Sequence, residues 1–307
     1  MAVGFITGRF GADRTDKILE LCFEEAKRED KKPIYILVPE KFTYEMEKRL
    51  SEKLEDEKNI DPNFRIRVVS FSTLSKIVFT NVGGLKERRL TTSARSLLTF
   101  KAMDMVSKDL ITFKSDDFKM GFVNNIMDMI IEFKQNDFSV TDVFSLTENV
   151  KNESLKFKMQ DLYNIYRSYE NLIDKKYSDT EDTLNIFAQK LDDFESIKGA
   201  TIFVDEYLDF TPAQYLVIEK LIYFSKNIYF SLLTDFKNLH SKMNMFLRSN
   251  STFLNIKNIC EKYNIPLLEN ISLSNESYYN SKDLSFLEKN IGTFSPKPYS
   301  KDSENIR

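Results

Sequence analysis

Short, almost wholly apolar runs alternate with amphipathic segments near the start of the chain and again after residue 195. The runs with the composition of buried β-strands are Val3–Thr7, Ile34–Val38, Val68–Ser70, Ile202–Val204 and Ile228–Leu232. Strands that are apolar on both faces are typical of parallel sheets covered by helices on each side. The alternation therefore predicts βαβ units, right-handed crossovers and an α/β fold with a parallel sheet.

The pattern changes between residues 91 and 194, where apolar residues recur at helical spacing and no strand is predicted. The four segments with this periodicity are Ala94–Lys108, Phe118–Lys134, Glu153–Lys175 and Thr180–Leu191. This change predicts a discontinuous α/β domain of residues 1–90 and 195–240, with residues 91–194 as an all-helical insertion. Residues 241–307 are expected to begin a following segment that ends in a flexible polar tail.

The first predicted strand ends in a glycine-bearing turn that leads into a helix. The spacing of Gly8 and Thr15 matches the phosphate-binding pattern G-x-x-x-x-G-K-[ST] in part, with Asp13 at its second glycine and Arg14 at its lysine. Glycine permits positive φ and a close approach of the backbone to a phosphate. Gly8, Gly11, Arg14 and Thr15 are therefore the candidate cofactor-binding residues.

Asp13 and Arg14 also weaken this interpretation. A carboxylate at Asp13 brings negative charge to the place of a triphosphate, and the planar fork of Arg14 differs from a compact ammonium. The alternative is a strand–turn–helix junction that binds nothing, with Arg14 neutralised by Asp13 or Asp16. The residues alone leave both interpretations open.

Two adjacent carboxylates, Asp205 and Glu206, follow the predicted strand Ile202–Val204. In nucleotide hydrolases an acid at such a strand end holds magnesium, and the next carboxylate orients the attacking water. The ends of parallel strands share one edge of the sheet, so we expect these acids to lie beside the opening turn. Asp205 and Glu206 are thus the candidate catalytic residues, in intact or vestigial form, and Thr15 with Asp205 is the candidate magnesium site.

Hydroxyl side chains cluster after the third predicted strand, at Ser70, Ser72 and Thr73. They could contact a nucleic-acid backbone, and helix capping accounts for them equally well. A net charge of −3 argues against a protein coated in nucleic acid but allows a local groove. Two cysteines far apart in the sequence indicate a reducing compartment, and the lack of a long apolar run indicates a cytoplasmic location without membrane association. The single histidine, His240, argues against triad chemistry and a histidine-rich metal centre.

At these motifs the chain resembles the AddB subunits of bacterial AddAB helicase–nucleases, specifically their N-terminal helicase-like region. The similarity covers the chain up to its polar tail. It lies in the ordered series GRFGADRT, ILVPEKFTYEMEKRL, VVSFSTLSKIVF, LYNIYRSYENLIDKKYSDTEDTL, IFVDEYLDFTPAQ and IYFSLLTD. The segments FTPAQ and SFS are more distinctive than the loop, which departs from the family pattern GRxGxGKT at Asp13 and Arg14.

The resemblance implies a RecA-like P-loop NTPase fold of the superfamily-one helicase type that does not act as the motor. It also implies ATP and Mg²⁺ as cofactors, an AddA-type subunit as partner, single-stranded DNA as ligand, and a role in DNA double-strand-break repair and recombination. The family's nuclease domain, with its iron–sulfur cluster, lies far downstream. Cys22 and Cys260 cannot supply the four ligands of such a cluster, so none is expected here.

Two other classes of function compete with this interpretation. A stand-alone P-loop enzyme, such as an ATPase or small kinase, would share the turn and the acids, but the long helical insertion and the lack of a substrate-binding signature argue against it. A structural scaffold for protein contacts would explain the altered loop. Nucleotide binding at Gly8–Thr15 separates these alternatives.

Overall fold

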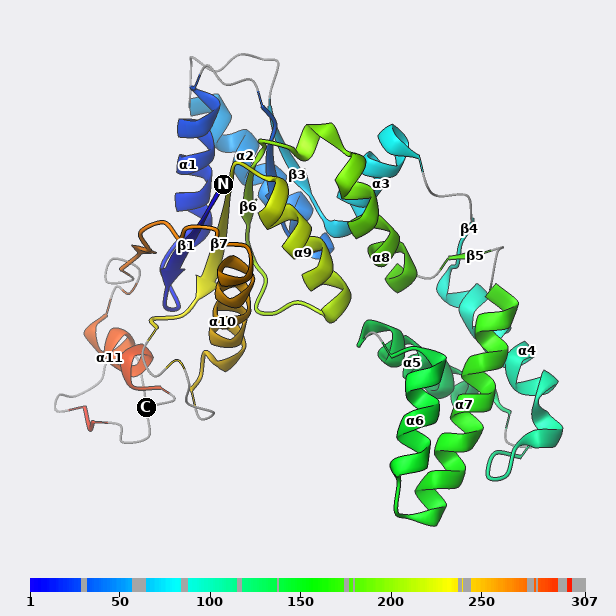
Figure 1. Ribbon diagram of the computed structural model, residues 1–307. Helices are drawn as coiled ribbons and strands as arrows, with labels where there is room; N and C mark the ends of the chain where they lie inside the picture. The colour runs from blue at the N-terminus through cyan, green and yellow to red at the C-terminus, as the bar shows by residue number, and fades with distance from the viewer. Residues whose placement is uncertain are drawn as a thin grey trace. The chain divides into compact units, whose positions relative to one another are not determined.

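The computed structural model describes residues 1–28, 32–56, 65–83, 88–114, 118–136, 138–173, 177–178, 180–236, 239, 244–274, 279, 281–291 and 297–299. The chain forms two compact units (Figure 1). The sheet unit comprises residues 1–77, 191–210 and 218–307, and the helical unit comprises residues 78–190 and 211–217. Residues 244–291, expected to begin a following segment, thus belong to the sheet unit; residues 300–307 of the predicted tail lie outside the described residues.

A six-stranded sheet forms the centre of the sheet unit, in the order β3-β2-β6-β7-β1-β8. Its strands are β1 (Ala2–Gly8), β2 (Ile34–Leu37), β3 (Ile66–Val69), β6 (Thr201–Val204), β7 (Asn227–Leu233) and β8 (Ile271–Ser272). Every pairing in it is parallel. The predicted parallel sheet is confirmed for all five apolar runs, and β8 is a sixth strand that the pattern did not predict.

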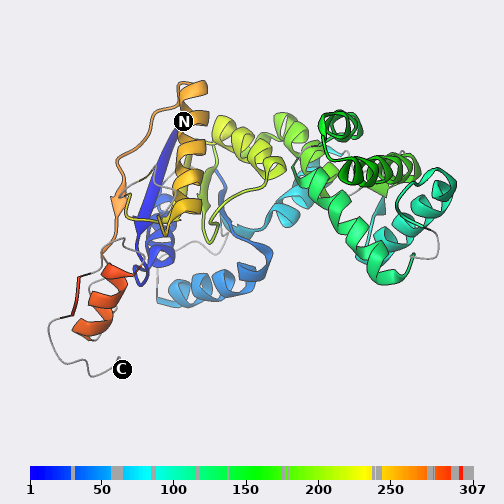
Figure 2. The ribbon, with the colours of Figure 1, turned by 90° about the horizontal axis from the view of Figure 1, so that it is seen from below.

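Helices connect the strands and cover both faces of the sheet (Figure 2). In the sheet unit they are α1 (Arg14–Ala26), α2 (Thr43–Asp56), α10 (Leu247–Lys262), α11 (Lys282–Asn290) and parts of α3 (Phe71–Val82) and α9 (Pro212–Phe224). One face packs α1 and α2 against Ile6, Ile36 and Phe203 of the strands. The other face receives α10, where Phe253 meets Phe5 of β1 at 4.8 Å between ring centroids. This two-sided cover explains why β1, β2 and β6 are almost wholly buried.

The helical unit is built from α4 (Thr92–Met105), α5 (Met120–Gln135), α6 (Val140–Asn149), α7 (Glu153–Ile173) and α8 (Thr180–Lys190). Its apolar core includes Met103, Val123, Ile165 and Tyr169. The sequence pattern missed α6, although Ser139 and Asp142 form a capping box at its start. The prediction of no strand was wrong at one place, because β5 (Tyr177–Ser178) pairs in parallel with β4 (Arg88–Arg89).

Among the described residues, no helix combines the length and apolar character that a membrane crossing requires.

Candidate functional site

The candidate residues gather at the carboxyl edge of the parallel sheet because the strands run in register. Gly8 at the end of β1 lies opposite Leu233 of β7, and Val204 at the end of β6 lies opposite Phe230. The backbone N–H of Thr234 donates to the carbonyl of Gly8 at 3.1 Å. The turns after β1, β6 and β7 therefore meet at one edge, as parallel topology requires.

The turn between β1 and α1 depends on two glycines. A Cβ at Gly8 would lie 2.6 Å from the Cβ of Ala12, so a side chain there would force the turn open. Gly11 has φ of +85°, which favours glycine. The N–H of Ala12 donates to the carbonyl of Arg9 at 3.1 Å and closes this tight turn. Both glycines thus serve a backbone conformation.

Several backbone N–H groups of this turn are bonded within the protein. Besides Ala12, the N–H of Arg14 donates to the carbonyl of Ala12 at 3.0 Å, and the N–H of Asp16 donates to a carboxylate oxygen of Asp13 at 2.9 Å. A phosphate-binding loop directs such groups at its ligand. Here three of them are satisfied internally, and the carboxylate of Asp13 lies at the N-terminus of α1.

Asp13 is paired with Arg49 of α2, whose Nη2 lies 2.8 Å from Oδ2. Burial opposes its ionised form, but the N–H of Asp16 and the guanidinium of Arg49 outweigh burial, and the pKa of Asp13 is lowered. Asp16 pairs with Lys53 at 2.8 Å. Among the described residues these acids pair with cations of α2, so the expected neutralisation of Arg14 by Asp13 or Asp16 is wrong. Whether the turn binds a phosphate or nothing stays open.

Arg14 instead turns back toward the sheet. Its Nη1 lies 3.4 Å from the carbonyl oxygen of Gly8 and its Nε lies 3.3 Å from Oγ of Ser231 on β7. Both hydrogen bonds are long. The guanidinium thus remains at the turn, and its charge favours the ionised form of Glu206.

Thr15 and Asp205 form the buried centre of the site. The hydroxyl of Thr15 donates to Oδ2 of Asp205 at 2.7 Å, and the two residues are 8% and 1% exposed. The other oxygen, Oδ1, is buried and has no hydrogen-bond partner among the described residues. A buried carboxylate oxygen without a partner is costly, and it could still accept one more donor or bind a cation. The predicted juxtaposition of Thr15 and Asp205 is thus present in the structure.

Glu206 borders the same site on a strained backbone with φ of +63°. Partial burial and the charge of Asp205 outweigh the opposing charge of Arg14, so the pKa of Glu206 is raised. Its side chain helps to line a small pocket of about 50 Å³. The residues that line this pocket are Thr15, Phe42, Glu45, Met46, Arg49 and Glu206.

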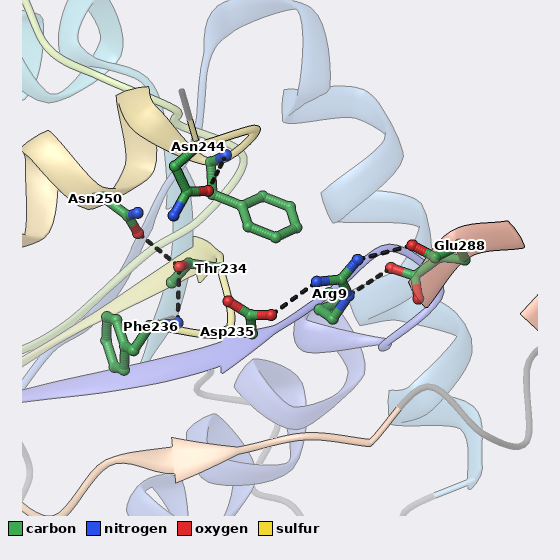
Figure 3. A network of polar contacts seen from close by, with 8 residues as sticks. Arg9, Thr234, Asp235, Phe236, Asn244, Asn250 and Glu288 are labelled. Atoms are coloured by element: carbon green, nitrogen blue, oxygen red, sulfur yellow. Dashed lines mark hydrogen bonds and ion pairs between the residues drawn. The ribbon is translucent and has the colours of Figure 1, made fainter. Parts of the chain in front are cut away.

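A further polar network, which the sequence reasoning missed, fixes the tip of the turn (Figure 3). Arg9 donates from Nη1 to Asp235 Oδ2 at 2.7 Å, from Nε to Glu288 Oε1 at 2.8 Å, and from Nη2 to the Glu288 carbonyl at 2.7 Å. Thr234 beside Asp235 donates to Asn250 of α10 at 2.6 Å. The sequence signal was confined to the position of Arg9 directly after Gly8, because its acidic partners are distant in the chain.

The hydroxyl cluster proposed for DNA lies at the start of α3, on the same edge. Ser70 is buried, donates to Glu40 and accepts from the N–H of Thr73 at 3.1 Å. Ser72 and Thr73 are partly exposed. Helix capping thus accounts for Ser70, while DNA contact by the cluster stays a prediction.

The chain matches a known protein family and several known proteins. Residues 5–288 match the family described as "ADDB, N-terminal", so the chain belongs to this AddB family. It is 34% identical over its whole length to the B-type subunit of the ATP-dependent helicase/deoxyribonuclease of Clostridioides difficile (strain 630). The corresponding subunits from Thermoanaerobacter sp. (strain X514) and Clostridium botulinum (strain Hall) are 32% and 33% identical, again over the whole chain. The chain spans 27% of the length of each of these relatives.

Proposed function

We propose that this chain is the non-motor, helicase-like module of a helicase–nuclease subunit that acts in DNA double-strand-break repair and recombination. Membership of the AddB N-terminal family and the names of the relatives support a role in such a subunit. The observation that carries the proposal is the pairing of Thr15 with Asp205 at 2.7 Å beside a turn whose amides bond internally. Asp205 and Thr15 resemble the acid and the hydroxyl of a nucleotide hydrolase, while the turn Gly8–Thr15 departs from a phosphate-binding loop.

The residues of the candidate site fit Mg²⁺ better than they fit ATP. Oδ1 of Asp205 and the hydroxyl of Thr15 are oxygen ligands of the kind that Mg²⁺ prefers, and the former lacks a partner among the described residues. A triphosphate fits poorly, since Asp13 lies at the helix N-terminus and the amides of Ala12, Arg14 and Asp16 are engaged. We therefore propose that Asp205 and Glu206 are vestigial in hydrolysis. The P-loop NTPase fold of RecA-like type is part of the same proposal.

We further propose an AddA-type subunit as partner and single-stranded DNA as ligand, both in the cytoplasm. The hydroxyl groups of Ser72 and Thr73 would contact DNA phosphates without reading sequence. Phosphates that lysine or arginine side chains neutralise would release counterions, and to that extent binding would weaken with salt. We expect that the purified chain neither degrades nor unwinds DNA. A preparation free of contaminating nuclease that degrades DNA would contradict this assignment.

Titration calorimetry with Mg²⁺ and a non-hydrolysable ATP analogue tests the altered loop. The unmodified chain should bind weakly or undetectably. The double variant Asp13→Gly with Arg14→Lys removes the carboxylate from the helix N-terminus and restores the compact ammonium, so its affinity should rise by about tenfold or more. Asp16→Asn is the matched control, because it removes an acid of the same helical turn whose carboxylate pairs with Lys53 of α2.

The outcomes separate the competing functions. Binding by the unmodified chain at low micromolar concentration would favour the stand-alone ATPase or kinase and overturn the proposal of an altered loop. A double variant that binds no better than the unmodified chain would favour the scaffold for protein contacts, in which the turn serves only folding.

A further inference from the structure

The parallel sheet ends at β8, and the residues before β8 continue the same edge. β8 is the last strand of the sheet, next to β1 (Figure 2). Leu267 forms a parallel bridge with Val3 of β1. The N–H of Val3 donates to the carbonyl of Pro266 at 3.0 Å, and the N–H of Leu268 donates to the carbonyl of Val3 at 2.7 Å. Residues 266–273 thus form one extended edge, which we call the β8 edge.

The main chain of Leu267 faces away from the sheet. The residues on either side of it bond to Val3, and in a parallel pair the residue between them directs its N–H and C=O outward. Among the described residues, neither Leu267 nor Glu269 takes part in a hydrogen bond between backbone groups. Residues 266–270 are all exposed. A solvent-exposed row of unpaired backbone groups is a template for one more strand.

The side chains of the β8 edge are apolar on both faces of the sheet. Leu268 lies over Gly4 of β1, where an added Cβ would be 3.4 Å from Cδ1 of the leucine. Leu267 directly precedes it and therefore points to the opposite face. The two leucines are 38% and 41% exposed. Edges that stay in water usually carry several charges, whereas Glu269 is the one charged residue in the sequence 266–273. The β8 edge thus suits a strand that is apolar on both faces.

A one-residue bulge divides the β8 edge. Leu267 lies opposite Val3, whereas Ile271 lies opposite Ile6, so the edge has one residue more than β1 between these two points. The bulge limits regular pairing to the residues around Leu268. A short contact of this kind buries little surface, so binding to it should be weak and reversible.

The β8 edge itself has the composition that its partner strand requires. In an antiparallel pair centred on Leu268, Leu267 of one copy would lie opposite Glu269 of the other, and the outward N–H and C=O groups of both would be paired. The two Leu268 side chains would meet, and no two carboxylates of Glu269 would lie opposite each other. Such a contact is symmetric, as is usual between identical chains.

We propose that the β8 edge binds the β8 edge of a second copy of this chain, through antiparallel pairing centred on Leu268. The second copy supplies hydrogen-bond partners for the main chain of Leu267 and Glu269, and it covers the exposed leucines. The two sheets then continue across the contact as one.

Sedimentation velocity of the purified chain at about 1 to 200 μM tests for the dimer. The unmodified chain should change from monomer to dimer across this range. Leu268→Lys removes an apolar contact and places like charges opposite each other, so it should weaken dimerisation by about tenfold or more. Leu247→Lys, at a leucine of α10 that is 39% exposed, is the matched control and should dimerise like the unmodified chain. A chain that stays monomeric, or normal dimerisation of Leu268→Lys, would overturn the proposal.

Exchange of charge between two variants tests the register. Leu268→Glu alone should dimerise as poorly as Leu268→Lys, because like charges again meet. An equimolar mixture of the two variants should regain the dimer, since opposite charges then face each other across the contact. Circular dichroism checks that both variants are folded. A folded mixture that stays monomeric contradicts pairing centred on Leu268.

Hydrogen–deuterium exchange of the unmodified chain locates the contact without any substitution. The amides of Leu267 and Glu269 should exchange rapidly in the dilute monomer and at least about tenfold more slowly in the concentrated dimer, because only the second copy gives them acceptors. Slow exchange in the monomer would assign the β8 edge to another segment of the same chain. Equal exchange in monomer and dimer would assign the dimer to another surface, and either result overturns the proposal.

Discussion

Each of the two units buries an aspartate almost completely, and the two carboxylates are satisfied very differently. In the helical unit Asp161 of α7 is fully buried and accepts three backbone N–H groups, from Ile111, Thr112 and Phe113, at 2.7, 2.6 and 2.9 Å. In the sheet unit Asp205 is 1% exposed, and one of its oxygens has no partner among the described residues. Both carboxylates are thus buried to a similar extent, but the donors are complete around Asp161 and incomplete around Asp205.

The difference separates a carboxylate whose oxygens are all hydrogen-bonded from one that keeps an unused acceptor oxygen. Backbone amides around Asp161 compensate for its lost hydration and fix the turn after α4 onto α7. Asp205 receives one hydroxyl, from Thr15, and its second oxygen remains a buried acceptor. Such an atom costs stability unless something binds to it, so functional sites are where it tends to be retained.

The largest effect is expected at Asp161. Asp161→Asn places an amide NH₂ against backbone donors and leaves at least one of them buried and unsatisfied, so the free energy of unfolding should fall by about 3 kcal/mol. Urea denaturation followed by circular dichroism measures the loss, and faster exchange of the amides of 111–113 locates it. Asp104→Asn, at an exposed position of α4, is the control. A loss no larger than that of the control would mean that the three amides find other partners.

A much smaller effect, in the opposite direction, is expected at Asp205. Asp205→Asn keeps an oxygen for Thr15 and removes a buried charge whose second oxygen lacks a donor among the described residues, so stability should change by less than about 1 kcal/mol, with a gain expected. Thr15→Val is the counterpart, because it removes the hydroxyl donor and should destabilise the sheet unit. The same urea titration measures both. A large loss in Asp205→Asn would show that the charge itself stabilises this edge.

The smallest effect is a pH dependence at Glu206. Its pKa is raised by partial burial and by Asp205, so the folded state binds this proton more tightly than the unfolded state. Stability relative to Glu206→Gln should therefore fall as the pH rises from about 4 through the raised pKa, by less than about 1 kcal/mol because solvent screens the group. Asp13, whose pKa is lowered, should behave oppositely and lose its contribution as the pH falls. Thermal unfolding of Glu206→Gln measured upward from about pH 4, and of Asp13→Asn measured downward from about pH 4, checks the two signs.

Apolar composition predicted five strands because most of their residues are buried between the helices on both faces of the sheet, although Arg67 of the edge strand β3 is exposed. It could not predict β8, whose two residues pair with Ile6 and Thr7 of β1 in a polar context. It also missed α6, which the spacing of Ser139 and Asp142 could have revealed. Short elements depend on the tertiary partner more than on their own sequence.

At the candidate site, topology made the meeting of Thr15 and Asp205 predictable, because parallel strand ends share an edge. The partners of charged side chains were not predictable: Asp13 pairs with Arg49, and Arg9 with Asp235 and Glu288. Such pairs are set by how helices dock. Asp161 did leave a signal, since it lies four residues before Ile165 on the apolar stripe of α7. An acid at a core position of an amphipathic helix indicates a buried carboxylate with dedicated donors.

The position of β1 in the sheet has a consequence for how the chain folds during synthesis. β1 lies between β7 and β8, so this strand leaves the ribosome well before the two strands with which it pairs, Ala2 meeting Asn227. At about 5–20 residues per second, roughly 10–45 s pass before that partner is made. The β2–β3 pair and residues 78–190 of the helical unit are complete within this interval. The turn after β1 therefore acquires its final shape late, and the long sequence separation makes closure of the sheet the slow step of folding.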